Sequence, residues 1–423
     1  KLNNQELVHE HLQQHSWVGI FISLMLLLAA AAKSAQLPFS SWLPRAMEGP
    51  TPSSAIFYGS LSVHFGAFLL MRTYPFWQEQ TAIKILIILL GFSTSIIATL
   101  ISKVQSTIKT QIAYASIAQI GLMFIEIALG FTNLALFHFM GNAFLRSYQL
   151  LISPSVVTYL IREQFYEIKK ESSRFNKAQN KLKNTFYVLS VKEWNLDSLT
   201  NKLLFTPLKK IGKKLDFITI NNVLYILLPI YTISLIFYMF QDVFHPQIYS
   251  YLPELFSIIS FVLVLKSFSE RKHPRLAWTL ILFSQLWIAL AISFNEKFDI
   301  NHTFWFLSGS IIAFVVGLAC LNILRKKEKH YFNLNQYYGH VYEYPKLSFV
   351  FLMSAMALMG FPITPSFIGE DLLLSHIHQN QVLLAFFVAF SYIMSGIALI
   401  RIYARLFLGN HIKTYHETAL KST

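Results

Sequence analysis

The sequence predicts an all-α, polytopic membrane protein of about eleven transmembrane helices, two of them broken, with an interfacial amphipathic segment. The 423 residues are 54% hydrophobic and only 13% charged, so polar side chains are too few to cover the surface of an ordinary soluble protein. Apolar runs long enough to cross a bilayer recur along the whole chain. These observations together exclude a soluble globular fold.

Short polar connections separate the apolar runs, and each run is expected to form one helix. The runs occupy residues 17–32, 54–71, 83–101, 110–129, 134–161, 223–240, 252–268, 276–294, 304–324, 347–361 and 382–407. They predict a transmembrane core (1–160), a basic cytoplasmic or interfacial segment (161–222), a four-helix transmembrane insertion (223–325) and terminal helices with a second broken helix and a cytoplasmic tail (346–423).

The connections between helices account for the net charge of +14. Every second connection is rich in basic residues, namely 102–109, 162–222, 269–275 and 325–330. Membrane proteins keep such connections on the cytoplasmic side. We therefore expect the basic connections and the C-terminal tail to face the cytoplasm and Lys1 to lie outside, with no nucleic-acid partner.

The stretch "EWNLDSLTNKLLFTPLKKIGKKL" combines apolar residues at helical spacing with lysines toward its end. This pattern predicts a helix that lies in the membrane interface with its lysines toward anionic headgroups. A solvated cytoplasmic linker is the alternative. The predicted apolar stripe consists of Trp194, Leu196, Leu199, Leu203 and Leu204.

The sequence offers no ligand set for a redox centre. Cys320 is the single cysteine, which excludes an iron–sulfur cluster held by this chain, and no glycine-rich phosphate loop is present. The histidines of "VHEHLQQH" (8–15) do not complete a zinc motif. We expect no metal site and no cofactor in this chain, so partners would handle any electrons, nucleotides or quinone.

Several ionisable residues interrupt the apolar runs. A charge at the centre of a bilayer costs at least about 2.5 kcal/mol, so it is kept mainly where it faces a hydrated interior. Several such residues in one chain indicate an ion pathway. They are Lys33, Arg45, Glu48, His64, His138, Arg146, Glu370 and Asp371.

The stretch "KSAQLPFSSWLPRAMEGPTPSSA" places a lysine beside a proline-broken backbone. Irregular backbone at membrane depth is tolerated only where it is buried in protein or lines a wet cavity. A desolvated lysine can lose its proton, and a neighbouring carboxylate can restore it, so Lys33 is a candidate proton-transfer group. The break is expected to be shaped by Pro38, Glu48, Gly49, Pro50 and Pro52.

This stretch resembles the signature of the antiporter-like subunits of respiratory complex I, most closely the largest one, and of Mrp-type cation/proton antiporters. Two further stretches, "KTQIAYASIAQIGLMF" and "ALFHFMGNAFLRSYQLLISPSVV", fit the family in the same order. "GFPITPSFIGEDLLL" is similar to its second broken helix, whereas residues 162–346 have no firm counterpart. The chain is identified as a divergent member of this family.

The resemblance implies roles for individual residues. Lys33 matches the central lysine of the family's proton path, Lys109 the next pathway lysine and His138 the bridging histidine. Arg146 stands where a lysine is usual, and a guanidinium can tune its neighbours but hardly relay a proton.

Other positions depart from the family pattern. Glu370 occupies the site of the terminal lysine, with Asp371 beside it. Asn142 replaces a second histidine and cannot titrate, and His64 lacks family support. The glutamate that pairs with the broken-helix lysine belongs to an earlier helix, and the chain begins with Lys1, so we expect its numbering to start within a longer product.

These residues also have structural interpretations. Lys33 fits a side chain that snorkels to the interface, Lys109 fits the basic cytoplasmic side, and His138 fits a hydrogen-bonded core histidine. Glu370 and Asp371 at the end of a broken helix also fit a helix cap.

The function implied by the resemblance is proton translocation in the cell inner membrane of a bacterium or an equivalent energy-coupling membrane. The chain would act with other membrane subunits and a peripheral redox module, in a complex of the NADH:quinone oxidoreductase type. The alternatives are a Dab-type inorganic-carbon uptake system with a soluble zinc protein, Na⁺/H⁺ antiport, and a scaffold that has lost transport.

Overall fold

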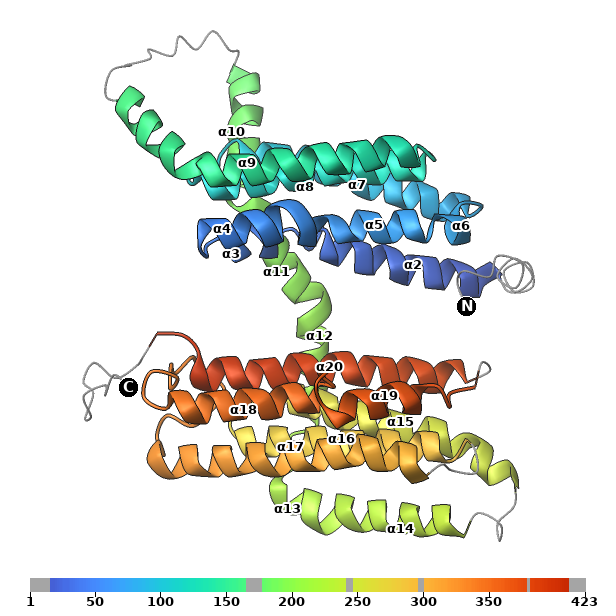
Figure 1. Ribbon diagram of the computed structural model, residues 1–423. Helices are drawn as coiled ribbons and strands as arrows, with labels where there is room; N and C mark the ends of the chain where they lie inside the picture. The colour runs from blue at the N-terminus through green and yellow to red at the C-terminus, as the bar shows by residue number, and fades with distance from the viewer. Residues whose placement is uncertain (1–15, 165–176, 241–245, 296–299, 379–380, 411–423) are drawn as a thin grey trace. The chain divides into compact units, whose positions relative to one another are not determined.

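The computed structural model describes residues 16–164, 177–240, 246–295, 300–378 and 381–410 (Figure 1). All regular elements in these residues are helices. Eight helices of the described residues are long and apolar enough to cross a membrane, and Gly19–Lys33 and Pro345–Leu358 are shorter apolar helices. The predicted all-α polytopic class is thereby confirmed. The chain divides into two compact units, Lys1–Leu203 and Leu204–Thr423.

Unit 1 contains the first five predicted apolar runs, and each coincides with helical structure (Figure 1). The run at 54–71 combines several short elements into one span, Thr51–Arg72. The elements are α2 (Ser16–Lys33), α3 (Trp42–Ala46), α4 (Thr51–Ser53), the π-helix η1 (Ser54–Leu61), the 3₁₀-helix η2 (Ser62–His64), α5 (Phe65–Arg72), α6 (Tyr74–Trp77), α7 (Thr81–Ser102), α8 (Ile108–Ala128) and α9 (Thr132–Gln164).

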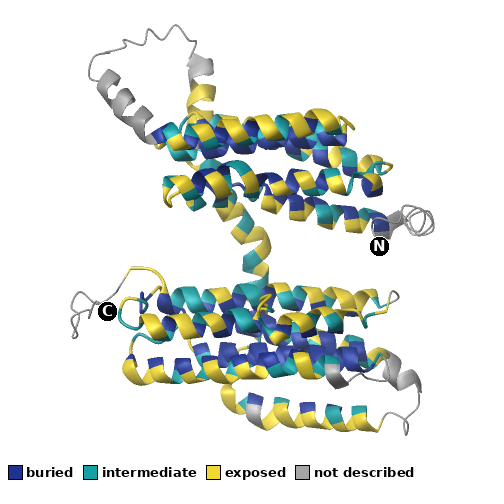
Figure 2. Cartoon of the chain, viewed as in Figure 1, coloured by how far each residue is buried: buried dark blue, intermediate teal, exposed yellow. Residues whose placement is uncertain are grey.

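Helix α8 lies at the centre of unit 1, with α7 on one side and α9 on another. Two glycines bring α7 and α8 together: a Cβ built on Gly91 would lie 2.4 Å from the carbonyl oxygen of Gly121, and the reverse distance is 2.6 Å. Small residues allow such backbone contact between membrane helices. Much of α9 is exposed (Figure 2). Its exposed residues include Phe137, Phe144 and Leu151, as expected of a surface that contacts lipid.

The polar segment that follows α9 forms a series of short helices. Trp194 does not belong to the predicted apolar stripe, because Glu193, Trp194 and Asn195 have positive φ angles and interrupt the helix. Its ring packs on the unit 1 core instead. Leu199, Leu203 and Leu204 are exposed. The described helices are α10 (Lys177–Val191), η3 (Glu193–Asn195), α11 (Leu196–Thr200), η4 (Asn201–Phe205) and α12 (Thr206–Lys214).

Helix α16 lies at the centre of unit 2 and is buried on nearly every side, because α15, α17 and α20 pack around it (Figure 2). Helix α12 packs on α15, where Gly212 approaches Ser269 closely. The remaining predicted runs all coincide with helices. The elements are α13 (Ile220–Asn222), η5 (Val223–Leu227), α14 (Leu228–Met239), α15 (Pro246–Ser269), α16 (Pro274–Ser293), α17 (Ile300–Lys327), α18 (Pro345–Leu358), α19 (Pro365–Leu374) and α20 (Val382–Phe407).

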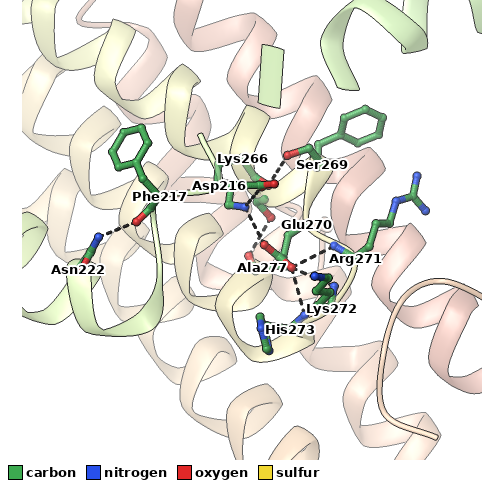
Figure 3. A network of polar contacts seen from close by, with 12 residues as sticks. Asp216, Phe217, Asn222, Lys266, Ser269, Glu270, Arg271, Lys272, His273 and Ala277 are labelled. Carbon is green, nitrogen blue, oxygen red and sulfur yellow. Dashed lines mark hydrogen bonds and ion pairs between the residues drawn. The ribbon is translucent and has the colours of Figure 1, made fainter. Parts of the chain in front are cut away.

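A polar network holds the connection between α15 and α16 (Figure 3). One oxygen of Glu270 accepts the backbone N–H groups of Arg271, Lys272 and His273 at 2.9–3.2 Å. The other oxygen lies 2.8 Å from Nζ of Lys266, a side chain that is 2% exposed. Asp216 approaches the same Nζ at 2.6 Å. The buried lysine is thus paired with two carboxylates, as the cost of burying a charge requires.

The basic connections gather at one end of unit 2. The backbone of Leu334 donates to Arg271, and Tyr338 donates to Arg405. At the other end, Asn295 contacts His376 and exchanges two hydrogen bonds of 2.6 Å with Gln381. This arrangement agrees with the alternation of basic and non-basic connections in the sequence.

Candidate functional site

The first broken helix interrupts unit 1 directly after Lys33. Helix α2 ends there, Ala35 adopts a positive φ angle of 52°, and the Leu37–Pro38 peptide bond is cis. Gln36 is fully buried and donates its amide to the carbonyls of Ser34 and Ile117 at 3.0 and 3.3 Å. The backbone N–H of Leu37 donates to the hydroxyl of Thr94 on α7 at 3.2 Å. Thr94 and the Gln36 side chain thus satisfy part of the broken backbone, and the Gln36 amide also ties the break to a backbone carbonyl of α8.

The break also contains polar atoms that remain unsatisfied. The hydroxyl of Ser34 and the amide oxygen of Gln36 are buried and have no hydrogen-bond partner among the described residues. Lys33 itself is exposed, and its amine has no ion pair or hydrogen bond with a described residue. No carboxylate of a described residue pairs with the Lys33 amine.

The turn after α3 is linked to the start of α8. Lys109 donates from Nζ to the carbonyl oxygen of Gly49 at 3.0 Å. The backbone N–H of Ser54 and the hydroxyl of Ser53 both donate to the carbonyl of Pro50. Glu48, Gly49, Pro50 and Pro52 form an exposed or partly exposed turn at this end of the unit. Lys109 thus stabilises the turn in this structure.

Asp197 connects the polar segment to the broken helix. Its carboxylate accepts hydrogen bonds from Ser41 and Arg45. Although partial burial acts to raise the pKa of Asp197, the bonds from Ser41 and Arg45 outweigh it and hold the pKa below its usual range. Arg45, which interrupts an apolar run, is therefore an ion-pair residue near the break.

Polar side chains on α8, which is apolar enough to cross a membrane, face polar side chains on α9. On α9 they recur every four residues, at His138, Asn142 and Arg146, and therefore lie on one face of the helix. On α8, Ser116, Gln119 and Glu126 form the opposing stripe. The two stripes run along the helices from the basic end, where Lys109 begins α8, toward the non-basic end, where α8 connects to α9.

His138 makes a hydrogen bond from each ring nitrogen. Nδ1 lies 2.8 Å from Oε1 of Glu126, and Nε2 lies 2.8 Å from Oε1 of Gln119. The carboxylate oxygen of Glu126 accepts a hydrogen bond, and the tautomer of the ring decides which nitrogen donates. His138 was identified from the sequence, whereas Glu126 and Gln119 were missed. The signal for Glu126 was an acidic residue within an apolar run.

Asn142 joins three polar groups deeper in the unit. Its Nδ2 lies 3.0 Å from Nε2 of His64 and 3.4 Å from the hydroxyl of Ser116. Its Oδ1 accepts from Nε of Arg146 at 3.1 Å, and Arg146 also donates to Gln149 at 2.7 Å. The Asn142 amide therefore connects a histidine with an arginine.

His64 lies where the span Thr51–Arg72 departs from regular α-helix. The π-helix η1 precedes it and the 3₁₀-helix η2 ends at it. Such irregular turns are frequent at functional sites. The side chain is fully buried, and its ring contacts that of Phe139 edge to face at 4.8 Å.

The second broken helix lies between α18 and α19 in unit 2. Gln285 donates to the carbonyl of Leu358 at 2.6 Å and Ser366 donates to that of Ala357 at 2.5 Å, so the free carbonyls of α18 are satisfied. Gly360 has a φ angle of 70°, and a Cβ built on it would lie 2.2 Å from Oε2 of Glu370. The Glu370 carboxylate therefore lies directly against the break, while Asp371 is exposed.

The predicted site residues fall into separate groups. His138 forms one cluster with Glu126 and Gln119. His64 and Arg146 form a second cluster around Asn142, one helical turn away along α9. Lys33 and Lys109 lie elsewhere in unit 1, and Glu370 and Asp371 lie in unit 2. The histidines at 9, 11 and 15 lie outside the described residues.

Comparison with known proteins agrees with this arrangement. The chain matches the family described as "NADH:quinone oxidoreductase/Mrp antiporter, TM" over residues 1–188 and 275–397, which together exceed half of its length. Both broken helices and the α8–α9 stripes lie within these ranges. The interruption, 189–274, is narrower than the stretch that the sequence left without a counterpart.

Named relatives match a shorter part of the chain. The NADH-ubiquinone oxidoreductase chain 5 of Neurospora crassa is 35% identical over 182 residues, which are 43% of this chain and 25% of the relative. The proteins of the same name from Aspergillus niger and Pongo abelii are 40% and 41% identical over 136 and 141 residues, or 32% and 33% of this chain and 21% and 23% of theirs.

These alignments span about a quarter of the length of the relatives. The family match is broader, and it includes the signature stretch, both broken helices and the polar stripes of α8 and α9. The chain therefore belongs to the family of transmembrane subunits of NADH:quinone oxidoreductases and Mrp antiporters.

Proposed function

We propose that this chain translocates protons across an energy-coupling membrane as an antiporter-like subunit of a complex of the NADH:quinone oxidoreductase type. The observation that carries the proposal is the pair of polar stripes on α8 and α9. They place a carboxylate within the apolar span of α8 and an imidazole and a guanidinium on the facing helix α9. Such groups are costly at membrane depth, and a helix that served only as an anchor would not need them. The names of the relatives favour a redox-coupled complex over an inorganic-carbon system.

In this mechanism, protons move between neighbouring groups whose charges alternately expel and attract them. An approaching cation expels a proton from its neighbour, and an approaching carboxylate restores it. Lys33 at the first break is the central group, with Lys109, His64 and His138 as further members and Arg146 as a fixed cation that tunes them. Glu370 and Asp371 at the second break are the terminal acids, as the resemblance implies.

The coupled reaction takes place in partner subunits. A peripheral redox module and other membrane subunits supply the energy, and quinone is handled by those partners. The membrane is the inner membrane of a bacterial cell or its mitochondrial equivalent.

The test is a substitution of Lys33 in the full-length protein within its complex, reconstituted in vesicles that contain a pH-sensitive dye. Lys33→Ala is expected to abolish proton pumping while the complex assembles normally, because the central group can no longer accept a proton. Lys103→Ala, which removes an exposed lysine from a basic connection, serves as the control and keeps pumping. Full pumping by Lys33→Ala would refute the proposed pathway.

A further inference from the structure

Glu126 lies near the C-terminal end of α8, where a carboxylate does not stabilise the helix. It lies in the last turn of α8, which ends at Ala128, whereas Lys109 lies in the first turn. The carbonyl end of a helix carries partial negative charge and disfavours a carboxylate. The side chain is one-fifth exposed, at 20%, so it borders the non-basic end of the span.

The two oxygens of Glu126 have different surroundings. Oε1 lies 2.8 Å from Nδ1 of His138. Oε2 is buried and has no hydrogen-bond partner among the described residues. An unsatisfied buried oxygen costs about 1–3 kcal/mol, so a pair that served only to join α8 to α9 would be improved by satisfying it. Oε2 is therefore an open acceptor site.

We propose that Glu126 and His138 form a proton-loading pair through which unit 1 exchanges protons with the non-basic side of the membrane. The inference rests on the proposed function and adds to it an access point within unit 1, separate from the terminal acids of unit 2. Gln119 acts as a positioning residue, because its bond to Nε2 holds the ring with Nδ1 toward the carboxylate.

The hydrogen bond between Glu126 and His138 defines how many protons the pair can hold. With one proton on their shared bond, the pair is neutral, as imidazolium with carboxylate or as imidazole with carboxylic acid. Both forms use the same 2.8 Å contact and need no movement of heavy atoms. A second proton from the non-basic side bonds to Oε2, and the pair then carries one positive charge.

Release reverses this loading. A positive charge that arrives deeper in the unit, at the His64–Asn142 contact one helical turn along α9, repels the loaded pair and expels the proton from Oε2. Arg146 holds the opposite side of the Asn142 amide and remains protonated throughout. Among the described residues, His64 is a further titratable group that interacts electrostatically with His138, and its ring contacts that of Phe139.

The first experiment measures protonation directly. Infrared difference spectra of the full-length protein in its complex are recorded between acidic and alkaline buffer. Glu126→Gln is expected to remove one band of a protonated carboxyl group, and Glu126→Asp is expected to shift it. Glu79→Gln, which neutralises an exposed acid in the α6–α7 connection, is the matched control and retains the band. An unchanged band in Glu126→Gln overturns the proposal, whether or not the wild type pumps.

The second experiment measures flux in reconstituted vesicles. Glu126→Gln can still accept a hydrogen bond from His138 but cannot take a proton, and flux is expected to fall by about 100-fold, the scale of a lost proton-transfer group. Glu126→Asp retains measurable flux, and Glu79→Gln retains full flux. Loss of flux in Lys33→Ala but not in Glu126→Gln would refute this inference and leave the proposed function intact. A wild type without flux would refute the proposed function.

Discussion

Glu270 is the carboxylate on which the connection between α15 and α16 depends. Burial by itself would raise its pKa, but hydrogen bonds from Lys266 and from the backbone of Lys272 and His273 hold the pKa below its ordinary value. The folded protein therefore binds a proton at this site less readily than the unfolded chain. By linkage, Glu270 contributes stability that is complete above the ordinary carboxyl pKa of about 4.3 and is lost as the pH falls through the lowered pKa.

We predict that Glu270→Gln destabilises unit 2 on the order of 3 kcal/mol near neutral pH, because Lys266 loses its buried partner. The loss should shrink in acid, where the wild-type carboxylate is itself protonated. Thermal unfolding in detergent at a series of pH values measures both effects. Glu254→Gln is the control, because Glu254 lies on α15, the helix that precedes Glu270, and is not labelled in the network of Figure 3. A difference between Glu270→Gln and wild type that does not change with pH would contradict the assignment.

Individual site residues differ in how readily the sequence identifies them. Lys33, His138, Arg146 and Glu370 stand out because their side chains are costly in an apolar run. Asn142 was seen only as a loss of titration, and its role as the contact between His64 and Arg146 depends on two helices meeting at that depth.

At the scale of elements, the approach of α7 to α8 controls the geometry around the first break. Gly91 and Gly121 let the two backbones touch, and Gly121 also borders the amide oxygen of Gln36, at 3.4 Å from a Cβ built there. Any separation of α7 from α8 would therefore disturb Gln36, which bridges the break to the carbonyl of Ile117.

We predict that Gly91→Ala destabilises unit 1 by about 1–3 kcal/mol, since the new methyl group would meet backbone that cannot rotate away. Gly141→Ala is the matched control, because a Cβ at that helical position meets nothing within 4 Å. It should be neutral or stabilising by up to about 1 kcal/mol, from higher helix propensity. Thermal unfolding of the purified protein compares the two. Equal melting temperatures for both variants would contradict the close α7–α8 contact.

The elements also differ in how well the sequence predicted them. Long apolar runs were predicted with their approximate ends, and both breaks occur at the expected prolines and glycines. Trp194 was wrongly placed on a helical stripe, because three successive left-handed residues are not apparent from apolar spacing. The amphipathic segment stays a prediction, with Lys210, Lys213 and Lys214 exposed on α12.

At the scale of the whole molecule, the alternation of basic and non-basic connections predicts the orientation of every helix. The single cysteine, Cys320, is buried at 5% exposure, so its replacement by alanine provides a clean background for labelling. Exposed positions are available on both kinds of connection. Lys103 and Lys329 lie on basic connections, and Phe131 and His378 on non-basic ones.

We predict that a membrane-impermeant maleimide labels Lys103→Cys and Lys329→Cys only from the cytoplasmic side, because positive connections are retained there. Phe131→Cys and His378→Cys should be labelled only from the opposite side. Intact cells and inverted vesicles supply the two orientations, and a membrane-permeant maleimide confirms that each cysteine is reactive. Labelling of Lys103→Cys and Phe131→Cys from the same side would contradict the orientation.

The sequence by itself determined the membrane class, the approximate helices, the two breaks and the family, because these depend on local composition and on short motifs that survive divergence. Only the tertiary structure decided which polar groups meet. His64 and Asn142 are 78 residues apart. Glu126 on α8 meets His138 on α9, and a rotation of either helix would separate them. The rotation and depth of each helix are set by packing between helices, such as the Gly91–Gly121 contact, and helical periodicity along one chain segment carries no information about the partner it will face.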